Sequence, residues 1–195
     1  MGLMSAAVKP ALLTPEEYLA IEGAALEKGE FYRGVMYAMS GANFAHNRVV
    51  TQLIIEFGKA LEGSSCYPVN SDQRIYVPAS GLFTYPDVAV VCGPPEYAPF
   101  SPKETLVNPV VIAEVLSPST EEYDRGAKFV HYQSIETLRD YLMLSRFEPL
   151  VAHYTKQPGG DWLPTVLGAA DTIQLPSAGC SIPVAAIYKG LALGR

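Results

Sequence analysis

Residues 108–129, NPVVIAEVLSPSTEEYDRGAKF, carry the strongest structural signal in the chain. Their first half, VVIAEVL (110–116), is rich in β-branched and aliphatic residues and predicts a strand that is buried on both faces. Glu114 places a carboxylate inside this run. A buried charge is costly unless it is paired or binds a metal ion, so Glu114 is a candidate functional residue.

A second strand signal, TYPDVAVVCG (84–93), also contains an acid, Asp87. If the two strands are neighbours, Asp87 and Glu114 converge at one edge of the sheet. Two carboxylates that lie close together repel each other and form a natural Mg²⁺ site, because hard cations prefer oxygen ligands. In the helix that follows, Asp124 and Lys128 are spaced i, i+4 and share one helix face.

The whole chain predicts the element order α-β-α-βββ-β-α-ββββ-α, which indicates one mixed α/β domain around a central sheet. The predicted helices cover 14–23, 45–63, a segment that begins at Ser117 or Ser119, and 182–192. The predicted strands cover 30–39 (with Gly34 as a bulge or turn), 66–69, 73–77, 84–93, 110–116, 140–145, 150–156, 161–167 and 172–175. Residues 93–109 are rich in proline and predict a surface loop. The domain is expected to span 1–195, with a flexible N-terminus over 1–12.

The composition is globular, with 49% hydrophobic residues and a formal net charge of −6. An acidic chain has no general attraction for nucleic acid or acidic membranes, so a nucleic-acid contact needs a local basic patch or a metal ion. Cys66, Cys92 and Cys180 form no CxxC pair, which argues against a zinc site and against a disulfide framework. We therefore expect a reducing, cytoplasmic setting, without a signal peptide or a membrane span.

Pro86-Asp87 followed by Glu114-Val115-Leu116 looks like the PD-(D/E)xK nuclease pattern, with Leu116 where that pattern has lysine. More of the chain resembles the Uma2 family, formerly a domain of unknown function and described as putative restriction endonucleases. The segments that carry this resemblance are GEFYRGVMYAMSGANFAHNRVV, YPDVAVV, IAEVLSPSTEEYDRGAKFVHYQ and LRDYLMLS. The resemblance runs from about Thr14 to Lys189.

The resemblance implies a restriction-endonuclease-like core, a central mixed sheet flanked by helices with a metal site at the sheet end. Carried over by position, Asp87 and Glu114 are the expected ligands of Mg²⁺ or Mn²⁺, and the backbone carbonyl of Val115 is a further one. Glu30 matches the family's acid at the start of the first strand, where it would ligate or orient a second metal or a water.

Two more catalytic candidates follow from the resemblance. Lys128 is expected to take the place of the missing lysine by reaching the site from its helix. His46 matches a histidine that the family often places on the second helix.

The implied reaction is metal-dependent hydrolysis of a phosphodiester by an endonuclease. The metal lowers the pKa of a bound water and neutralises phosphate charge, and the lysine orients the nucleophile or stabilises negative charge. DNA is the expected partner, with RNA as an open alternative. The basic residues expected to face the site are Arg33, Arg48, Arg74, Arg125 and Lys128. A homodimer is also expected, with an interface drawn from Tyr141, Tyr154 and Trp162.

Each candidate also has a structural interpretation. Glu114 can pair with Arg125 or Arg74, and Asp87 can be a turn or strand-end residue. Lys128 and Glu30 can be surface residues, and His46 a cap or core residue. Leu116 and the acidic charge also support a different function, a catalytically weak or inactive nuclease-fold protein that acts as a nucleic-acid-binding or regulatory module.

Overall fold

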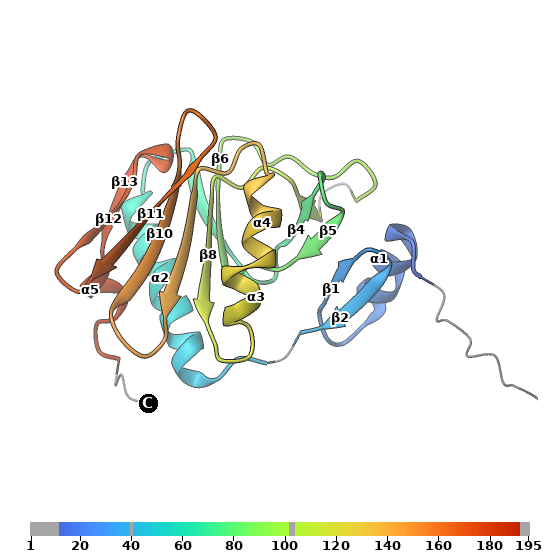
Figure 1. Cartoon of the computed structure of the whole chain (residues 1–195), viewed down its shortest axis with the longest axis horizontal. Coiled ribbons are helices and arrows are strands. Elements are labelled where there is room, and N and C mark those ends of the chain that lie inside the picture. Colours follow the sequence, from blue (N-terminus) through green and yellow to red (C-terminus); the bar gives the residue numbers. More distant parts are fainter. Residues whose placement is uncertain (1–11, 40, 102–103, 192–195) are drawn as a thin grey trace, which may run out of the picture.

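The computed structural model describes residues 12–39, 41–101 and 104–191. These residues form a six-stranded sheet, a five-stranded sheet and a two-stranded hairpin, with helices on both faces of the larger sheet. The expected mixed α/β class is confirmed (Figure 1). The predicted flexible segment 1–12 lies outside the described residues except for Leu12.

The chain begins with a helix and a hairpin that belong to the five-stranded sheet. Thr14 caps the first helix through a capping box, since its amide donates to Glu17 Oε2 at 2.8 Å and its Oγ1 accepts from the Glu17 amide at 3.2 Å. Arg33 and Gly34 both have positive φ angles, 48° and 83°, as a tight hairpin turn requires. The predicted strand 30–39 is therefore two strands with a turn at Gly34. The elements are α1 (Pro15–Ala24), β1 (Gly29–Tyr32) and β2 (Val35–Ala38).

The five-stranded sheet has the order β2-β1-β5-β4-β7. Its remaining strands are β4 (Arg74–Val77), β5 (Leu82–Thr84) and β7 (Thr105–Leu106). β7 lies inside the predicted loop 93–109 and pairs with β4 in parallel. A two-residue strand has too short a pattern to be distinguished from a loop by sequence.

The six-stranded sheet has the order β11-β10-β9-β8-β6-β3. It is mixed, as expected, because β8 and β9 are parallel while its other neighbours are antiparallel. All six residues of β8 are buried, which confirms the prediction of a strand covered on both faces. The strands are β3 (Cys66–Asn70), β6 (Val88–Cys92), β8 (Val111–Leu116), β9 (Asp140–Ser145), β10 (Leu150–Lys156) and β11 (Trp162–Gly168).

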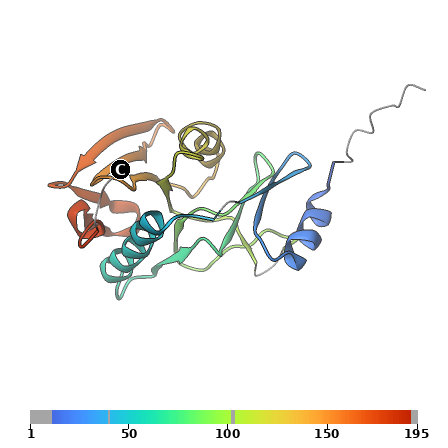
Figure 2. The same ribbon diagram turned by 90° about the horizontal axis from the view of Figure 1, so that it is seen from below.

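Two hydrophobic cores cover the two faces of this sheet. Figure 2 shows helices on both sides of the sheet. On one face, Val49, Leu53 and Phe57 of α2 (Phe44–Ala60) pack with α5 (Val184–Ile187) and with the hairpin of β12 (Thr172–Leu175) and β13 (Cys180–Pro183). On the other face, Phe129 and Tyr132 come from α4 (Ala127–Gln133), which follows α3 (Glu121–Arg125). The predicted closing helix 182–192 is shorter than expected because β13 occupies its first residues.

The predicted helix start at Ser117 or Ser119 is wrong. The helix begins at Glu121, and the hydroxyl of Ser117 lies 3.0 Å from that of Ser119 and 2.9 Å from that of Thr120. These hydroxyls bond one another and the chain turns once before the helix forms. Gly126 then divides the predicted helix into α3 and α4.

The expectation of no disulfide is also wrong. Cys66 of β3 and Cys92 of β6 are register partners and form a disulfide, with Cα atoms 3.9 Å apart. The sequence separation of 26 hides this pairing in the sequence. The cysteine argument for a reducing, cytoplasmic setting therefore does not hold. Within the described residues, no helix has the length and apolarity to cross a membrane.

Candidate active site

The two acids singled out by the sequence lie side by side. β6 and β8 are antiparallel neighbours with Val88 opposite Ala113, and continuing this register by one residue places Asp87 opposite Glu114. The Asp87 amide donates to Glu114 Oε2 at 3.3 Å, and the Val115 amide donates to Asp87 Oδ2 at 2.7 Å. The pair lies where β6 begins, beside the central strand β8, and not on an edge strand of the sheet.

Lys128 reaches this pair from α4 across the sheet face. Its Nζ lies 2.9 Å from Glu114 Oε1, 3.3 Å from Glu30 Oε1 and 3.5 Å from Asp124 Oδ1. Only 5% of Lys128 is exposed, which contradicts the alternative that Lys128 is a surface residue. Glu114 is paired, but with Lys128 and not with Arg125 or Arg74.

Burial dominates the electrostatics of this cluster. Burial raises the pKa of Glu114, Lys128 opposes that shift, and the nearby carboxylates of Asp124 and Asp87 add to it. Burial alone would lower the pKa of Lys128, but the surrounding acids, Glu114 first, raise it well above its usual range. Lys128 is therefore a fixed positive charge among more carboxylates than it can neutralise. Such a cluster favours binding of a further cation.

Hydroxyl groups behind the cluster hold its carboxylates in place. Tyr132 donates to Glu114 Oε1 at 3.0 Å, and Thr84 donates to Glu30 Oε1 at 2.6 Å. Tyr132 is fully buried. Glu30 contacts Lys128 from β1 but is not among the described residues that line the cavity beside the site.

His46 approaches Asp87 from the opposite side. Asn43 caps α2 by accepting from the His46 amide at 2.9 Å, which fixes the histidine in the first turn. The His46 Nε2 atom then lies 3.1 Å from Asp87 Oδ2. Burial lowers the pKa of His46, but the hydrogen bond and charge of Asp87 outweigh it and raise the pKa above 6.5. His46 therefore orients Asp87.

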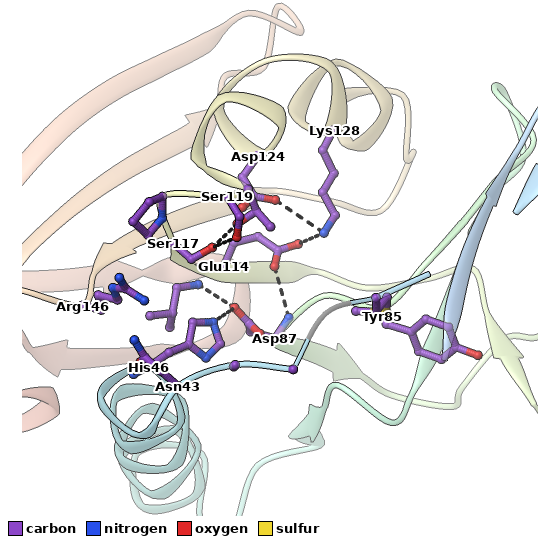
Figure 3. A pocket seen from close by; sticks show the side chains of 16 residues that line it. Asn43, His46, Tyr85, Asp87, Glu114, Ser117, Ser119, Asp124, Lys128 and Arg146 are labelled. Atoms are coloured by element: carbon purple, nitrogen blue, oxygen red, sulfur yellow. Dashed lines mark hydrogen bonds and ion pairs between the residues drawn. The ribbon is translucent and has the colours of Figure 1, made fainter. Parts of the chain in front are cut away.

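These side chains border a cavity of about 360 Å³ (Figure 3). Asp87, Glu114 and Val115 line it together with Lys128 and His46. The other lining residues are Met39, Gly41, Ala42, Asn43, Tyr85, Ser117, Pro118, Ser119, Thr120, Asp124 and Arg146. Four of the five predicted catalytic residues thus meet at one cavity, and Glu30 supports it from behind.

The donors at this cavity fit a hard divalent cation. Asp87 Oδ2 is engaged by Val115 and His46, whereas Oδ1 accepts no hydrogen bond from the described residues. No group of three or more His, Cys, Asp or Glu side chains in the described part of the chain is arranged to hold a metal by itself. Mg²⁺ is commonly held by one or two carboxylates plus water and substrate phosphate. The donor set therefore suits Mg²⁺ or Mn²⁺ that is bound partly by water and substrate, rather than a metal ion enclosed by protein ligands alone.

Most of the basic residues expected at the site are elsewhere. Arg74 is buried in an ion pair with Glu22 and donates to Thr105 Oγ1 at 2.8 Å. The remaining arginines, Arg33, Arg48 and Arg125, are exposed and outside the cavity lining.

Arg146, which no sequence pattern marked, does line the cavity. It follows β9 directly, and because β8 and β9 are parallel their ends meet at the same side of the sheet. Knowledge of the β8–β9 pairing would have identified Arg146 as a residue of the cavity.

The expected aromatic interface is contradicted for Tyr141, which is fully buried and stacks on Phe129 with ring centroids 4.9 Å apart. Tyr154 and Trp162 are half-buried against the same phenylalanine. A homodimer stays a prediction without a defined interface.

Comparison with known proteins identifies the family. The model of the Uma2 family, described as "Putative restriction endonuclease", matches residues 15–185. The chain belongs to the Uma2 family. The family match confirms the resemblance seen in the sequence motifs and covers residues 15–185.

Two similar proteins come from one Synechocystis strain. The chain is 39% identical over 180 residues to "Uncharacterized protein slr1290" of Synechocystis sp. (strain ATCC 27184 / PCC 6803 / Kazusa), covering 92% of this chain and 93% of that one. It is 35% identical over 156 residues to "Uncharacterized protein sll1609" of the same organism, covering 80% and 88%. The two matches cover 92% and 80% of the Uma2 chain.

A solved structure shares the fold. It is described as "a putative nuclease belonging to DUF820" from Anabaena variabilis ATCC 29413, and it matches with a TM-score of 0.73. The two chains are 14% identical, and the match covers 90% of this chain and 97% of that one. The Uma2 chain thus has the fold of that protein.

Proposed function

We propose that this Uma2 protein is a metal-dependent endonuclease that hydrolyses phosphodiester bonds in DNA. The observation that supports this most is the Asp87–Glu114 pair, which shares one cavity with Lys128. The family description and the description of the structural relative point in the same direction.

Asp87, Glu114 and the carbonyl of Val115 would hold Mg²⁺ or Mn²⁺. When bound, the ion lowers the pKa of a water and neutralises charge on the phosphate. The roles of the protein groups follow from their contacts. His46 and Tyr132 hold the two carboxylates, and Lys128 presents an ammonium group 2.9 Å from Glu114 for orienting the nucleophile or stabilising developing negative charge.

The position of Lys128 supports an active enzyme in spite of Leu116. Leu116 is 6% exposed and packs with Phe129 and Tyr132 in the core beneath α4. In place of a lysine at position 116, Lys128 enters from α4. It reaches the carboxylate of Glu114, which lies two residues before Leu116 on β8. Lys128 would then supply, from another element, the charge that the nuclease pattern assigns to its strand lysine.

Cleavage of supercoiled plasmid in Mg²⁺ and in Mn²⁺ tests this function. We expect nicking by the wild type and loss of nicking in Asp87→Ala and Glu114→Ala. Asp161→Ala, which removes an exposed carboxylate from the β10–β11 turn, is the matched control and should retain full activity. Parallel assays with single-stranded RNA and DNA assign the substrate.

The alternative is a nuclease-fold binding module without catalysis. A folded wild-type protein that nicks nothing in either metal but shifts oligonucleotides in Ca²⁺ would establish that alternative. Nicking that persists in both alanine variants would instead place the activity outside this cavity.

A further inference from the structure

Arg146 is a cation at the cavity without a partner in the described part of the chain. None of the ion pairs or side-chain hydrogen bonds among those residues includes its guanidinium, and its Nε is buried without an acceptor. Arginine carries five donors, and a buried one without an acceptor costs free energy. Such an unsatisfied group calls for an external acceptor.

The other positive group of the cavity is already neutralised. Lys128 contacts three carboxylates, those of Glu114, Glu30 and Asp124. His46 is engaged by Asp87. Among the described cations that line the cavity, Arg146 is therefore the one whose charge is available to an incoming anion.

The strand pairing places Arg146 where an extended anion would pass. Leu116 of β8 is the register partner of Ser145 of β9, so Ser117 and Arg146 follow side by side as the two parallel strands end. Figure 3 shows Arg146 and Lys128 on opposite sides of the Asp87–Glu114 pair. The cavity thus has a free cation on one flank and the catalytic carboxylates in its middle.

The side chain of Arg146 also packs on a neighbouring aromatic ring. Its Cζ lies 4.6 Å from the ring centroid of Phe147, so the guanidinium stacks on an aromatic face. Stacking covers a face of the guanidinium and not its edge, where the two Nη groups lie beyond the buried Nε. This planar fork matches the paired oxygens of a phosphate better than an ammonium does.

We propose that Arg146 is the phosphate-binding residue of this cavity, holding a backbone phosphate of the substrate strand so that the strand crosses the Asp87–Glu114 pair. This inference rests on the proposed nuclease function. It adds a positioning residue that lies outside the PD-(D/E)xK pattern. It also explains how an acidic protein can hold a polyanion, through one local cation and the bound metal.

The test is binding of fluorescein-labelled oligonucleotides, single-stranded and duplex, in Ca²⁺ over a range of salt concentrations. Wild type is compared with Arg146→Ala and Arg146→Lys. Arg139→Ala is the control, because Arg139 is an exposed arginine that precedes β9 at its other end. Thermal unfolding tests whether each variant is folded. If Arg146→Ala is not folded, the comparison is made with Arg146→Lys.

Arg146→Ala should weaken binding roughly 10- to 100-fold, as expected for the loss of a charged hydrogen-bonded contact. The slope of log K against log salt should fall by about 0.7 to 0.9, the value of one phosphate contact. Arg146→Lys should keep most of that slope but bind less tightly, since it retains the charge and loses the fork. Arg139→Ala should leave both quantities within about twofold of wild type. A purely structural role for Arg146 would not change the salt slope.

The inference is overturned if Arg146→Ala keeps the wild-type affinity and slope, or if Arg139→Ala changes them equally. If the wild type still nicks plasmid in that case, the proposed function stands and only the phosphate contact is wrong. A folded wild type that neither binds an oligonucleotide in Ca²⁺ nor nicks plasmid overturns the function and this inference together.

Discussion

Two histidine–aspartate pairs among the described residues lie at the six-stranded sheet, and they differ in access: His46 reaches the start of β6 from α2, whereas His153 and Asp140 both belong to strands. His46 contacts Asp87 at the cavity, and His153 of β10 contacts Asp140 of β9 at 2.7 Å. The Asp87 side chain is 20% exposed, whereas that of Asp140 is 1% exposed. The same residue types therefore occupy an open site and a closed one.

The two aspartates also differ in how many of their oxygens are engaged. Asp140 Oδ1 accepts from His153 and Thr155, and its Oδ2 accepts from Ser177 at 2.5 Å, which ties the C-terminal segment to β9. Asp87 keeps one oxygen without a partner in the described residues and faces the cavity. A satisfied cluster stabilises the fold, and an unsatisfied one can bind a ligand.

The largest effect that we expect concerns the cation of the open site. Lys128→Met should lower the free energy of unfolding by about 3–5 kcal/mol, because it leaves buried carboxylates without their partner. Urea denaturation measures this loss. Lys59→Met is the control, since Lys59 is an exposed lysine of α2 paired with Glu56, and it should cost less than about 1 kcal/mol. Equal losses in the two variants would mean that Lys128 does not neutralise the cluster.

A smaller loss of stability is expected at the closed site. Asp140→Ala should destabilise the protein by about 2–3 kcal/mol, because His153 and Ser177 lose a shared acceptor. The nicking rate per folded molecule should not change. Urea denaturation and the plasmid assay, run on the same preparation, measure the two quantities. A folded Asp140→Ala variant without nicking activity would show that the closed site also contributes to catalysis.

Local sequence patterns predict much of the sheet. The predicted strands 140–145, 150–156 and 172–175 coincide with β9, β10 and β12. These segments combine β-forming residues with clear turn signals at their ends, so their boundaries are locally encoded. Asp87 and Glu114 were predictable as candidates for a similar reason, since each acid stands out against apolar neighbours. Their convergence also depends on the pairing of β6 with β8.

Features that depend on pairing between distant segments are not predictable in this way. The Cys66–Cys92 disulfide exists because β3 and β6 adopt one particular register. Arg146 reaches the cavity because β9 lies parallel to β8, and its own neighbours in sequence carry no sign of that. Register is decided by the packing of whole strands, so a single-sequence pattern does not contain it.

The smallest effect that we expect separates the two histidines. His46→Gln should raise the Mn²⁺ concentration needed for half-maximal nicking by about 10- to 100-fold, because a group that orients a metal ligand typically contributes that much to metal affinity. His153→Gln should leave the Mn²⁺ dependence unchanged and lower the stability instead, since His153 holds Asp140 in the closed site.

This pair of variants tests the comparison directly, because both remove a histidine that contacts an aspartate. A metal titration followed by plasmid nicking gives the first quantity, and urea denaturation gives the second. If His46→Gln lost stability without any change in Mn²⁺ dependence, His46 would be a structural partner of Asp87, as His153 is of Asp140. A shift in Mn²⁺ dependence confined to His46→Gln would instead mean that the two histidine–aspartate pairs have different roles. Solvent access to the aspartate and one carboxylate oxygen without a hydrogen bond would then distinguish a binding site from a structural pair of the same residue types.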